Sequence, residues 1–246
     1  EVQKAPELFP YIKLMCDASD ERGLFWLTGS EQYSMMKNIT ESLAGRIGIM
    51  TLYPLSYAEV HGIEFPAELD FSLDALISRQ NIAPTCDLVG VFEFIWRGGM
   101  PQVQGATDEE RSMYYSAYID TYLMRDVTDV GGVSDSLSFR TFIAACAANS
   151  AQLLNMNTLA TLTGISAPTA KAWLGILERL HIVYLLKPYA NNKFKRLVKA
   201  PKLYFTDTGL CTYLTKWLNK DVLLSGNAAG HYFENYVVME LIKELD

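Results

Sequence analysis

Apolar and polar positions in the first quarter of the chain follow two kinds of spacing. In residues 4–18 and 30–46 the apolar positions recur every three or four residues, which predicts two amphipathic helices. In residues 24–30 and 47–56 they run consecutively over a short stretch and end in turn residues or a proline, which predicts two strands. Because helix and strand alternate, this part favours a parallel α/β sheet.

The pattern becomes helical from about residue 86, after a less regular connection at residues 59–82. Three helices are expected, at residues 87–103, 107–130 and 134–152. Gly98-Gly99 should break the first of them, and Thr107 and Glu110 have the spacing of a capping box at the start of the second.

The best-formed local pattern lies in residues 155–186. Two amphipathic helices flank a turn at Gly164, and Ser166 is placed to cap the second helix. This is a helix-turn-helix outline. Residues 181–207 then contain two apolar strands around a basic loop, which is the pattern expected of a wing.

A final amphipathic pattern at residues 230–245 places Phe233, Val237 and Leu241 on one face of a predicted helix. This pattern is still running at the last residue, and the first residue is not a methionine. We therefore expect the chain to be a piece of a longer protein.

Composition narrows the class of protein. Half of the 246 residues are hydrophobic, which is enough for packed cores in two compact units or in one unit with an appendage. The net charge of −7 argues against electrostatic binding of nucleic acid by the protein as a whole. Such binding would require a local basic patch. Four scattered cysteines argue against structural zinc and a disulfide framework. With no long apolar run and no signal peptide, we expect a soluble, cytoplasmic protein without a membrane partner.

Ordered motifs along nearly the whole chain resemble a family of prokaryotic AAA+ superfamily ATPases of poorly defined function. The N-terminal part carries "LTGS" and "ESLAGR", and the C-terminal part carries "YIDTYLMRDV", "SAPTAKAWLGILERLHIVYLLKPY", "PKLYFTDTGL" and "FENYVVMELIK". In that family a Walker B strand precedes the first two motifs. Its C-terminal half carries a winged-helix-like segment and a restriction-endonuclease-like domain of unknown function.

The resemblance implies an α/β plus α fold, with a partial P-loop (AAA+) parallel-sheet domain, a helical lid, a winged helix-turn-helix and the start of a nuclease-like domain. The expected domains are the trailing half of the ATPase core at 1–62, the helical lid and linker at 63–125, the winged-helix-like module at 126–187, and the wing hairpin with the start of the nuclease-like domain at 188–246. The P-loop, G-x-x-x-x-G-K-[ST], is not found in these residues and would lie upstream.

Carried over by position, the resemblance implies three roles in the hydrolysis of ATP, with Mg²⁺ as the accompanying cofactor. Glu1 matches the second acid of Walker B, which would polarise the attacking water. Ser30, with Thr28 as the alternative, matches a γ-phosphate sensor, and Arg46 is the candidate arginine finger. Two plainer interpretations remain open: Thr28-Gly29-Ser30 is a simple turn, and Arg46 is a surface arginine that complements a helix dipole.

Three further residues have candidate roles. Trp96–Pro101 is similar to a Gly-Gly-x-Pro feature of the lid in such ATPases, where Arg97 would reach the nucleotide; a solvated arginine at a helix break is the alternative. Glu234 matches the family's acid near a metal, but the carboxylates and lysine that cleavage also needs do not follow it, so we predict neither a metal site nor nuclease activity in this chain. Asp207 is interpreted as the N-cap of the turn that follows it.

The helix-turn-helix offers a candidate surface for duplex DNA. Lys171 leads the second helix, although its first turns carry no Arg or Asn, which favour base readout. The following loop holds the one basic stretch of an acidic chain: Lys187, Lys193, Lys195, Arg196, Lys199 and Lys202. Contact with DNA phosphates, docking to a partner protein and a solvated hairpin all remain open for it.

The expected function is the binding and hydrolysis of ATP, coupled to a conformational change that acts on DNA or on a partner protein. A homo-oligomer is compatible with an arginine finger supplied across subunits. The alternative is a non-enzymatic winged-helix module that binds DNA or protein and uses its α/β part as a scaffold or dimerisation surface.

Overall fold

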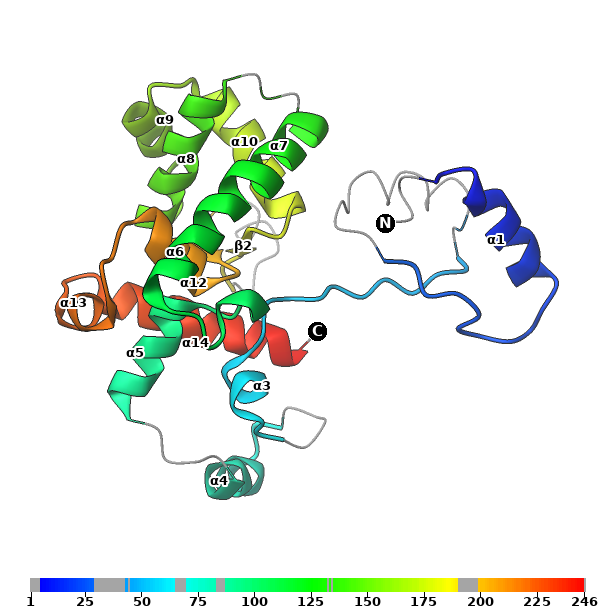
Figure 1. The fold of residues 1–246 in the computed structure, drawn as a ribbon, viewed down its shortest axis with the longest axis horizontal. Coiled ribbons are helices and arrows are strands. Elements are labelled where there is room, and N and C mark those ends of the chain that lie inside the picture. The colour runs from blue at the N-terminus through cyan, green and yellow to red at the C-terminus, as the bar shows by residue number, and fades with distance from the viewer. Residues whose placement is uncertain are drawn as a thin grey trace.

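Most of the chain that the structure describes is helical. The computed structural model describes residues 5–28, 43, 45–64, 70–82, 87–131, 133, 135–189 and 199–245. The α-helices are α1 (Leu8–Asp17), α3 (Tyr57–His61), α4 (Leu73–Ile82), α5 (Leu88–Arg97), α6 (Asp108–Ala117), α7 (Met124–Gly131), α8 (Ser136–Ala148), α9 (Met156–Thr163), α10 (Ala167–Arg179), α12 (Thr208–Leu214), α13 (Lys220–Ser225) and α14 (Ala229–Leu245). Shorter turns are the 3₁₀ helix η2 (Pro101–Val103) and the π-helix η3 (Tyr118–Leu123), and the strands are β1 (Gln152–Leu153), β2 (Val183–Leu186) and β3 (Lys202–Phe205). The fold is therefore mixed α/β with a dominant helical part (Figure 1).

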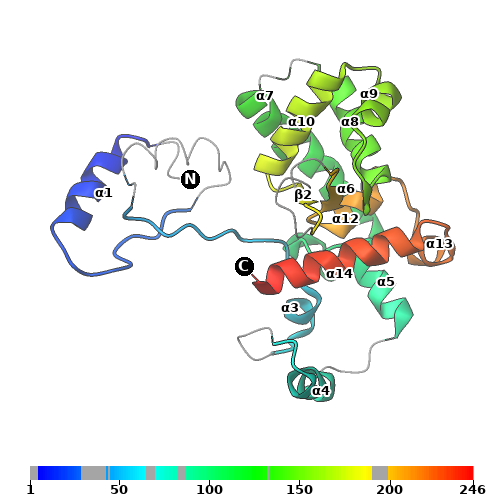
Figure 2. The same cartoon turned by 180° about the vertical axis from the view of Figure 1, so that it is seen from behind.

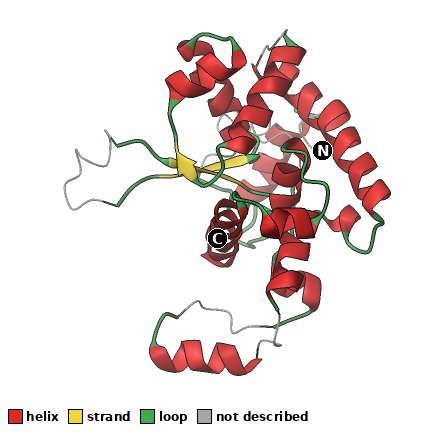
Figure 3. Cartoon of the chain, turned by 90° about the vertical axis from the view of Figure 1, so that its left-hand side faces the viewer, coloured by secondary structure: helices red, strands yellow, loops and turns green. Residues whose placement is uncertain are grey.

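The three strands form one antiparallel sheet in the order β1-β3-β2. Tyr184 of β2 lies opposite Tyr204 of β3, and Gln152 of β1 lies opposite Leu203 on the other edge of β3. This small sheet lies at one side of the helical body, where α10 contacts β2 and α14 contacts β3 (Figure 3), and its central strand β3 is mostly buried. Among the described residues no strands pair in parallel, so the predicted parallel sheet is not part of the fold there.

The N-terminal segment lies to one side of the helical body, to which an extended segment joins it (Figures 1 and 2). The helix predicted at residues 4–18 is confirmed as α1. Phe9 of α1 and Leu43 are buried together in a small apolar cluster of their own. The N-terminal segment therefore has a packing centre separate from the main core.

The two strands predicted at residues 24–30 and 47–56 are wrong over the part of these segments that the structure describes. The backbone there is extended but is assigned to no strand. A strand is held by hydrogen bonds to a neighbouring strand, and the described residues supply no such neighbour. Most of the helix predicted at 30–46 lies outside the described residues.

The helices predicted from residue 87 onward are confirmed. α5 ends at Arg97, directly before Gly98-Gly99. Thr107 and Glu110 form the predicted capping box, in which each side chain accepts a hydrogen bond from the backbone N–H of the other residue. The connection expected at residues 59–82 is more regular than predicted, because it contains α3 and α4.

The helix-turn-helix pattern is confirmed in its two helices. α9 ends at Thr163 and is capped by Gly164, whose φ of 68° is in the left-handed region that glycine adopts readily. The Ser166 hydroxyl caps α10 by accepting a hydrogen bond from the Thr169 N–H at 3.2 Å. Trp173 of α10 packs edge-on against Phe139 of α8. The three helices α8, α9 and α10 therefore share one core with the rest of the body.

The apolar face predicted for the last helix is not its buried face. Phe233 and Val237 of α14 are exposed, whereas Asn235 and Met239 are buried. The Asn235 side chain accepts from the Phe205 N–H at 2.8 Å and donates to the Phe205 carbonyl at 2.8 Å. The inward face of α14 thus combines the apolar Tyr232 and Met239 with a polar residue that is paired with β3.

Cysteines in the described chain are free thiols. Cys146 and Cys211 are buried in the main core, and Cys16 is half-buried in α1. Burial raises the pKa of Cys211 to about 12, so this thiol is unreactive as long as the core is intact. None of the described helices is long and apolar enough to cross a lipid bilayer.

Candidate functional site

The residues predicted to act in ATP hydrolysis lie in the N-terminal segment, and two of them are described. Glu1 and Ser30 lie outside the described residues. Thr28 is exposed at the end of an extended stretch. Arg46 forms an ion pair with Asp17, the last residue of α1. A guanidinium near a helix C-terminus is electrostatically favourable, so this position suits both interpretations of Arg46, and the roles of all four residues stay predictions.

Arg97, the predicted nucleotide contact, makes several internal hydrogen bonds. Its guanidinium donates to the Glu93 carboxylate at 2.9 Å and to the Ala106 carbonyl at 2.7 Å. It also lies 3.6 Å from the Asp108 carboxylate. These contacts tie the end of α5 to the start of α6. Nucleotide contact by Arg97 stays a prediction, and it would require these bonds to open.

The basic residues predicted to contact DNA lie on different elements. Lys171 is exposed on α10, and Lys199 is exposed shortly before β3. Lys193, Lys195 and Arg196 lie outside the described residues. Lys202 donates to the Glu234 carboxylate at 2.6 Å, so part of the positive charge of this stretch is neutralised within the protein.

Glu234, which the resemblance associates with a metal, links α14 to β3. Its carboxylate accepts from Lys202 and, at 2.8 Å, from the Tyr204 hydroxyl. Partial burial alone would raise the pKa of Glu234, but these two hydrogen bonds and the lysine charge outweigh it, and the pKa is lowered overall. Within the described ranges no three His, Cys, Asp or Glu side chains come together in a way that could hold a metal ion.

Asp207 is the centre of a buried polar cluster between α5, α6 and α12. Its side chain is 2% exposed. Oδ1 accepts from the Leu210 N–H at 2.6 Å and from the Tyr115 hydroxyl at 2.8 Å, and Oδ2 accepts from the Gly99 N–H at 2.7 Å. The bond to Leu210 confirms the predicted N-cap. The bond to Gly99 joins two motifs that are 108 residues apart in the sequence.

Two glycines allow the backbones to meet at this cluster. A methyl group on Gly209 would overlap the Tyr115 hydroxyl and the Arg97 carbonyl. A methyl group on Gly99 would overlap the Leu55 carbonyl. The close approach of α5, α12 and the segment before α3 therefore depends on the absence of a side chain at these positions.

Arg111 of α6 lies beside the Asp207 cluster and is 3% exposed. Its Nη2 donates to the carbonyls of Trp96 and Gly209 and, at 2.8 Å, to the Thr212 hydroxyl. The guanidinium also lies over the Trp96 ring, 3.9 Å from its centroid. Nε has no hydrogen-bond partner within the described chain. Burial lowers the pKa of Arg111, because it removes water from the charged guanidinium.

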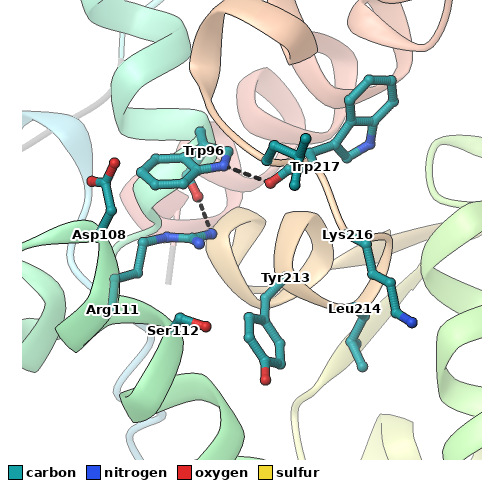
Figure 4. Close-up of a pocket in the computed structure, with 9 residues that line it drawn as sticks. Trp96, Asp108, Arg111, Ser112, Tyr213, Leu214, Lys216 and Trp217 are labelled. Atoms are coloured by element: carbon teal, nitrogen blue, oxygen red, sulfur yellow. Dashed lines mark hydrogen bonds between the residues drawn. The ribbon is translucent and has the colours of Figure 1, made fainter.

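A cavity of about 390 Å³ opens next to Arg111. Its apolar and aromatic lining comes from Trp96, Tyr213, Leu214, Trp217 and Leu218, and its polar lining from Asp108, Arg111, Ser112 and Lys216. Figure 4 shows the Arg111 guanidinium between Trp96 and Tyr213. The size and the mixture of aromatic walls with a few polar groups are typical of small-molecule sites.

The segment that leads from the N-terminal part into the helical body is clamped on both sides. The Leu55 N–H donates to the Gly99 carbonyl at 2.8 Å, and the Leu55 carbonyl accepts from Lys243 Nζ at 3.0 Å. The Tyr57 N–H donates to the Glu240 carboxylate at 2.8 Å. Burial raises the pKa of Glu240, so its charge depends on this contact and on Lys243. α14 and the Gly-Gly break of α5 therefore hold residues 55–57 in place.

The sequence reasoning did not single out Arg111, Tyr115 or Trp217. One signal was available in the sequence. Arg111 and Tyr115 are four positions apart in α6, so they share a helix face. An arginine on a face that also carries a buried aromatic residue is unusual. Trp217 gave no local signal, because the cavity forms only when α5, α6 and the end of α12 meet.

Two family models match the chain. An AAA domain matches residues 1–61, and this match relates the N-terminal segment to AAA-type ATPases. A domain of unknown function, DUF8612, matches residues 90–221, which is more than half of the chain. The chain therefore belongs to the DUF8612 family.

Uncharacterised proteins from three bacteria are similar to the chain. Those of Mycobacterium tuberculosis and Mycobacterium bovis are each 25% identical over 243 residues, which cover 98% of this chain and 49% of the relative. One from Haemophilus influenzae is 24% identical over 224 residues, which cover 88% of this chain and 50% of the relative. The chain thus spans about half the length of the curated relatives it matches. No solved structure matches it.

Proposed function

We propose that the chain is part of an AAA-type ATPase in which movement of a nucleotide-binding part reaches the helical body through residues 55–57. The AAA domain match over residues 1–61 is the observation that carries the ATPase assignment. The clamp formed by Gly99, Glu240 and Lys243 supports the coupling, because a displacement of Leu55 or Tyr57 would pull directly on α5 and α14.

In this proposal ATP and Mg²⁺ are the cofactors of the full-length protein. Glu1 polarises the attacking water, Ser30 or Thr28 senses the γ-phosphate, and Arg46 stabilises the charge of the transition state from a neighbouring subunit of a homo-oligomer. The ion pair of Arg46 with Asp17 would then open when Arg46 turns to the nucleotide.

We expect the full-length protein to hydrolyse Mg-ATP and the Glu1→Gln variant to bind ATP while kcat falls roughly 10²–10⁴-fold, because the water-activating base is lost. Arg46→Ala should lower kcat to a similar degree. Steady-state turnover and equilibrium binding of ATP measure these effects. The matched control is Arg22→Ala, which removes another exposed arginine of the same segment and should leave kcat unchanged.

Mixing the two inactive variants tests the assignment of Arg46. If Arg46 acts across subunits, a mixture of Glu1→Gln and Arg46→Ala regains part of the activity, because some interfaces pair an intact Glu1 with an intact Arg46. A mixture that stays inactive would contradict action across subunits. Full turnover by both variants would reject the ATPase assignment for these residues.

A winged-helix module that binds duplex DNA is the second candidate, and strand topology favours it. The order α8, β1, α9, α10, β2 and β3, with β3 between the other two strands, is the arrangement of a helix-turn-helix followed by a wing hairpin. Lys171 on α10 and the basic residues of the hairpin would contact phosphates. The same surface would otherwise dock a partner protein. The nuclease-like start at residues 188–246 stays a prediction.

DNA binding by this module should weaken steeply with salt. We expect the combined change of Lys193, Lys195 and Arg196 to Ala to weaken binding of duplex DNA and to lower the slope of log K against log salt by about 2–3, because each lost phosphate contact releases roughly one counterion fewer. Fluorescence anisotropy over a salt series measures the slope. The control, Lys216→Ala, removes a lysine far from the hairpin in sequence. An unchanged slope would favour protein docking.

A further inference from the structure

Arg111 has an unusual electrostatic environment. Buried charges in proteins are normally paired with an opposite charge. Within the described chain Arg111 forms no ion pair, and its partners are two backbone carbonyls and the Thr212 hydroxyl. The buried carboxylate of Asp207 is engaged by three other donors, and Nε of Arg111 remains without a partner. The guanidinium therefore has no carboxylate in direct contact, although the charges of Asp207 and Asp108 act on it through space.

The cavity beside Arg111 has room for an anionic group in contact with the guanidinium. It is about 390 Å³ in volume, and three aromatic residues, Trp96, Tyr213 and Trp217, contribute to its walls. Planar aromatic groups gain from stacked or edge-to-face contact with such side chains. The ligand most suited to this space has a flat ring, placed beside Tyr213.

The charges around the cavity define the charge of the ligand. Arg111 and Lys216 each contribute one positive charge, and Asp108 contributes one negative charge at the rim. The Asp108 carboxylate is largely exposed and lies 3.6 Å from Arg97, so it is partly compensated. The two cations that line the cavity, Arg111 and Lys216, can therefore pair directly with a single anionic group.

We propose that this cavity binds a small planar aromatic molecule with one anionic group, such as an aromatic carboxylate, whose negative charge faces Arg111. The ring packs beside Tyr213, and Lys216 adds attraction at the entrance. This binding site is independent of the proposed ATPase function, since none of the residues predicted to act on ATP contributes to it. The site is in the helical body, so its occupation bears on how α5, α6 and α12 are held together.

The test compares 2-naphthoate with the uncharged 2-naphthylmethanol by isothermal titration calorimetry on the full chain. We expect 2-naphthoate to bind roughly tenfold more tightly, because only the carboxylate can pair directly with the Arg111 guanidinium. In NMR spectra the indole N–H signals of Trp96 and Trp217 should shift, while those of Trp26 and Trp173 should not. Equal affinity for both compounds, or shifts at Trp173 alone, would overturn the proposal.

A matched pair of variants tests the electrostatics without touching the core. Leu218 lies at the cavity rim and is 80% exposed, so both Leu218→Glu and Leu218→Lys should fold. Their affinities for 2-naphthoate should differ roughly 3–10-fold in favour of lysine, and their affinities for 2-naphthylmethanol should be equal. Equal 2-naphthoate affinities in the two variants would mean that charge does not govern binding, which contradicts the proposal.

Discussion

Gly209→Ala is expected to lower the free energy of unfolding by about 3–4 kcal/mol, at the upper end of the range for overpacked sites. The added methyl group would overlap the Tyr115 hydroxyl and the Arg97 carbonyl. Arg97 presents backbone at this point, and its position is fixed by the end of α5, so it cannot move aside as a flexible side chain would. The two helices α5 and α12 would have to separate, which also disturbs the Asp207 hydrogen bonds.

Guanidinium chloride unfolding followed by tryptophan fluorescence measures this effect. Gly175→Ala is the matched control, since Gly175 is inside α10 and its new methyl group would meet only the flexible end of Arg179. This control should gain about 0.5–1 kcal/mol from the higher helix propensity of alanine. A Gly209→Ala variant within 1 kcal/mol of the parent protein would show that α5 and α12 can part at little cost.

Local signals predicted the elements of the helical body well. Thr107 with Glu110 and Ser166 cap the helices that their spacing indicated, and Asp207 caps α12 where only a turn was expected. Gly164 ends α9 as expected. Each of these signals depends only on residues within about four positions, because a cap forms a hydrogen bond to a nearby backbone N–H. Such features can be read from the sequence without knowledge of the tertiary structure.

Features that depend on distant partners were missed or wrong. Phe233 and Val237 lie on the exposed face of α14. The pattern of apolar residues alone had predicted that this face is the buried one. The inward face carries Tyr232, Asn235 and Met239, and the Asn235 amide pairs with both backbone groups of Phe205. The pairing satisfies a buried polar side chain, and nothing in residues 230–245 reveals that Phe205 is the partner.

The same reason explains the N-terminal strands and the candidate sites. Residues 24–28 and 47–53 have the composition of strands, but strand formation depends on a neighbour, which is absent from the described residues. Likewise, the sequence pattern predicted a helix break at Gly98-Gly99 and an N-cap at Asp207, with no link between the two. Their hydrogen bond across 108 positions became visible only in the folded chain.

Asp207→Ala should be at least as destructive as Gly209→Ala, with a loss of about 4–6 kcal/mol in the free energy of unfolding. The substitution leaves three donors buried without an acceptor, namely the N–H groups of Gly99 and Leu210 and the Tyr115 hydroxyl. Each unsatisfied buried donor costs about 1–3 kcal/mol. A loss of this size is a large part of the stability of an ordinary domain. Circular dichroism and denaturant unfolding of the purified variant measure it.

Two further variants separate the buried hydrogen bonds from capping as such. Asp135→Ala removes an N-cap of the same residue type from the exposed start of α8 and should cost much less, because water can replace the lost acceptor. Tyr115→Phe removes one of the three donors, so the double variant with Asp207→Ala should lose less than the sum of the single variants. Strict additivity would mean that Tyr115 and Asp207 do not stabilise each other. Similar losses for Asp135→Ala and Asp207→Ala would mean that Asp207 acts as a cap alone, and that its bond to Gly99 does not hold α5 to α12.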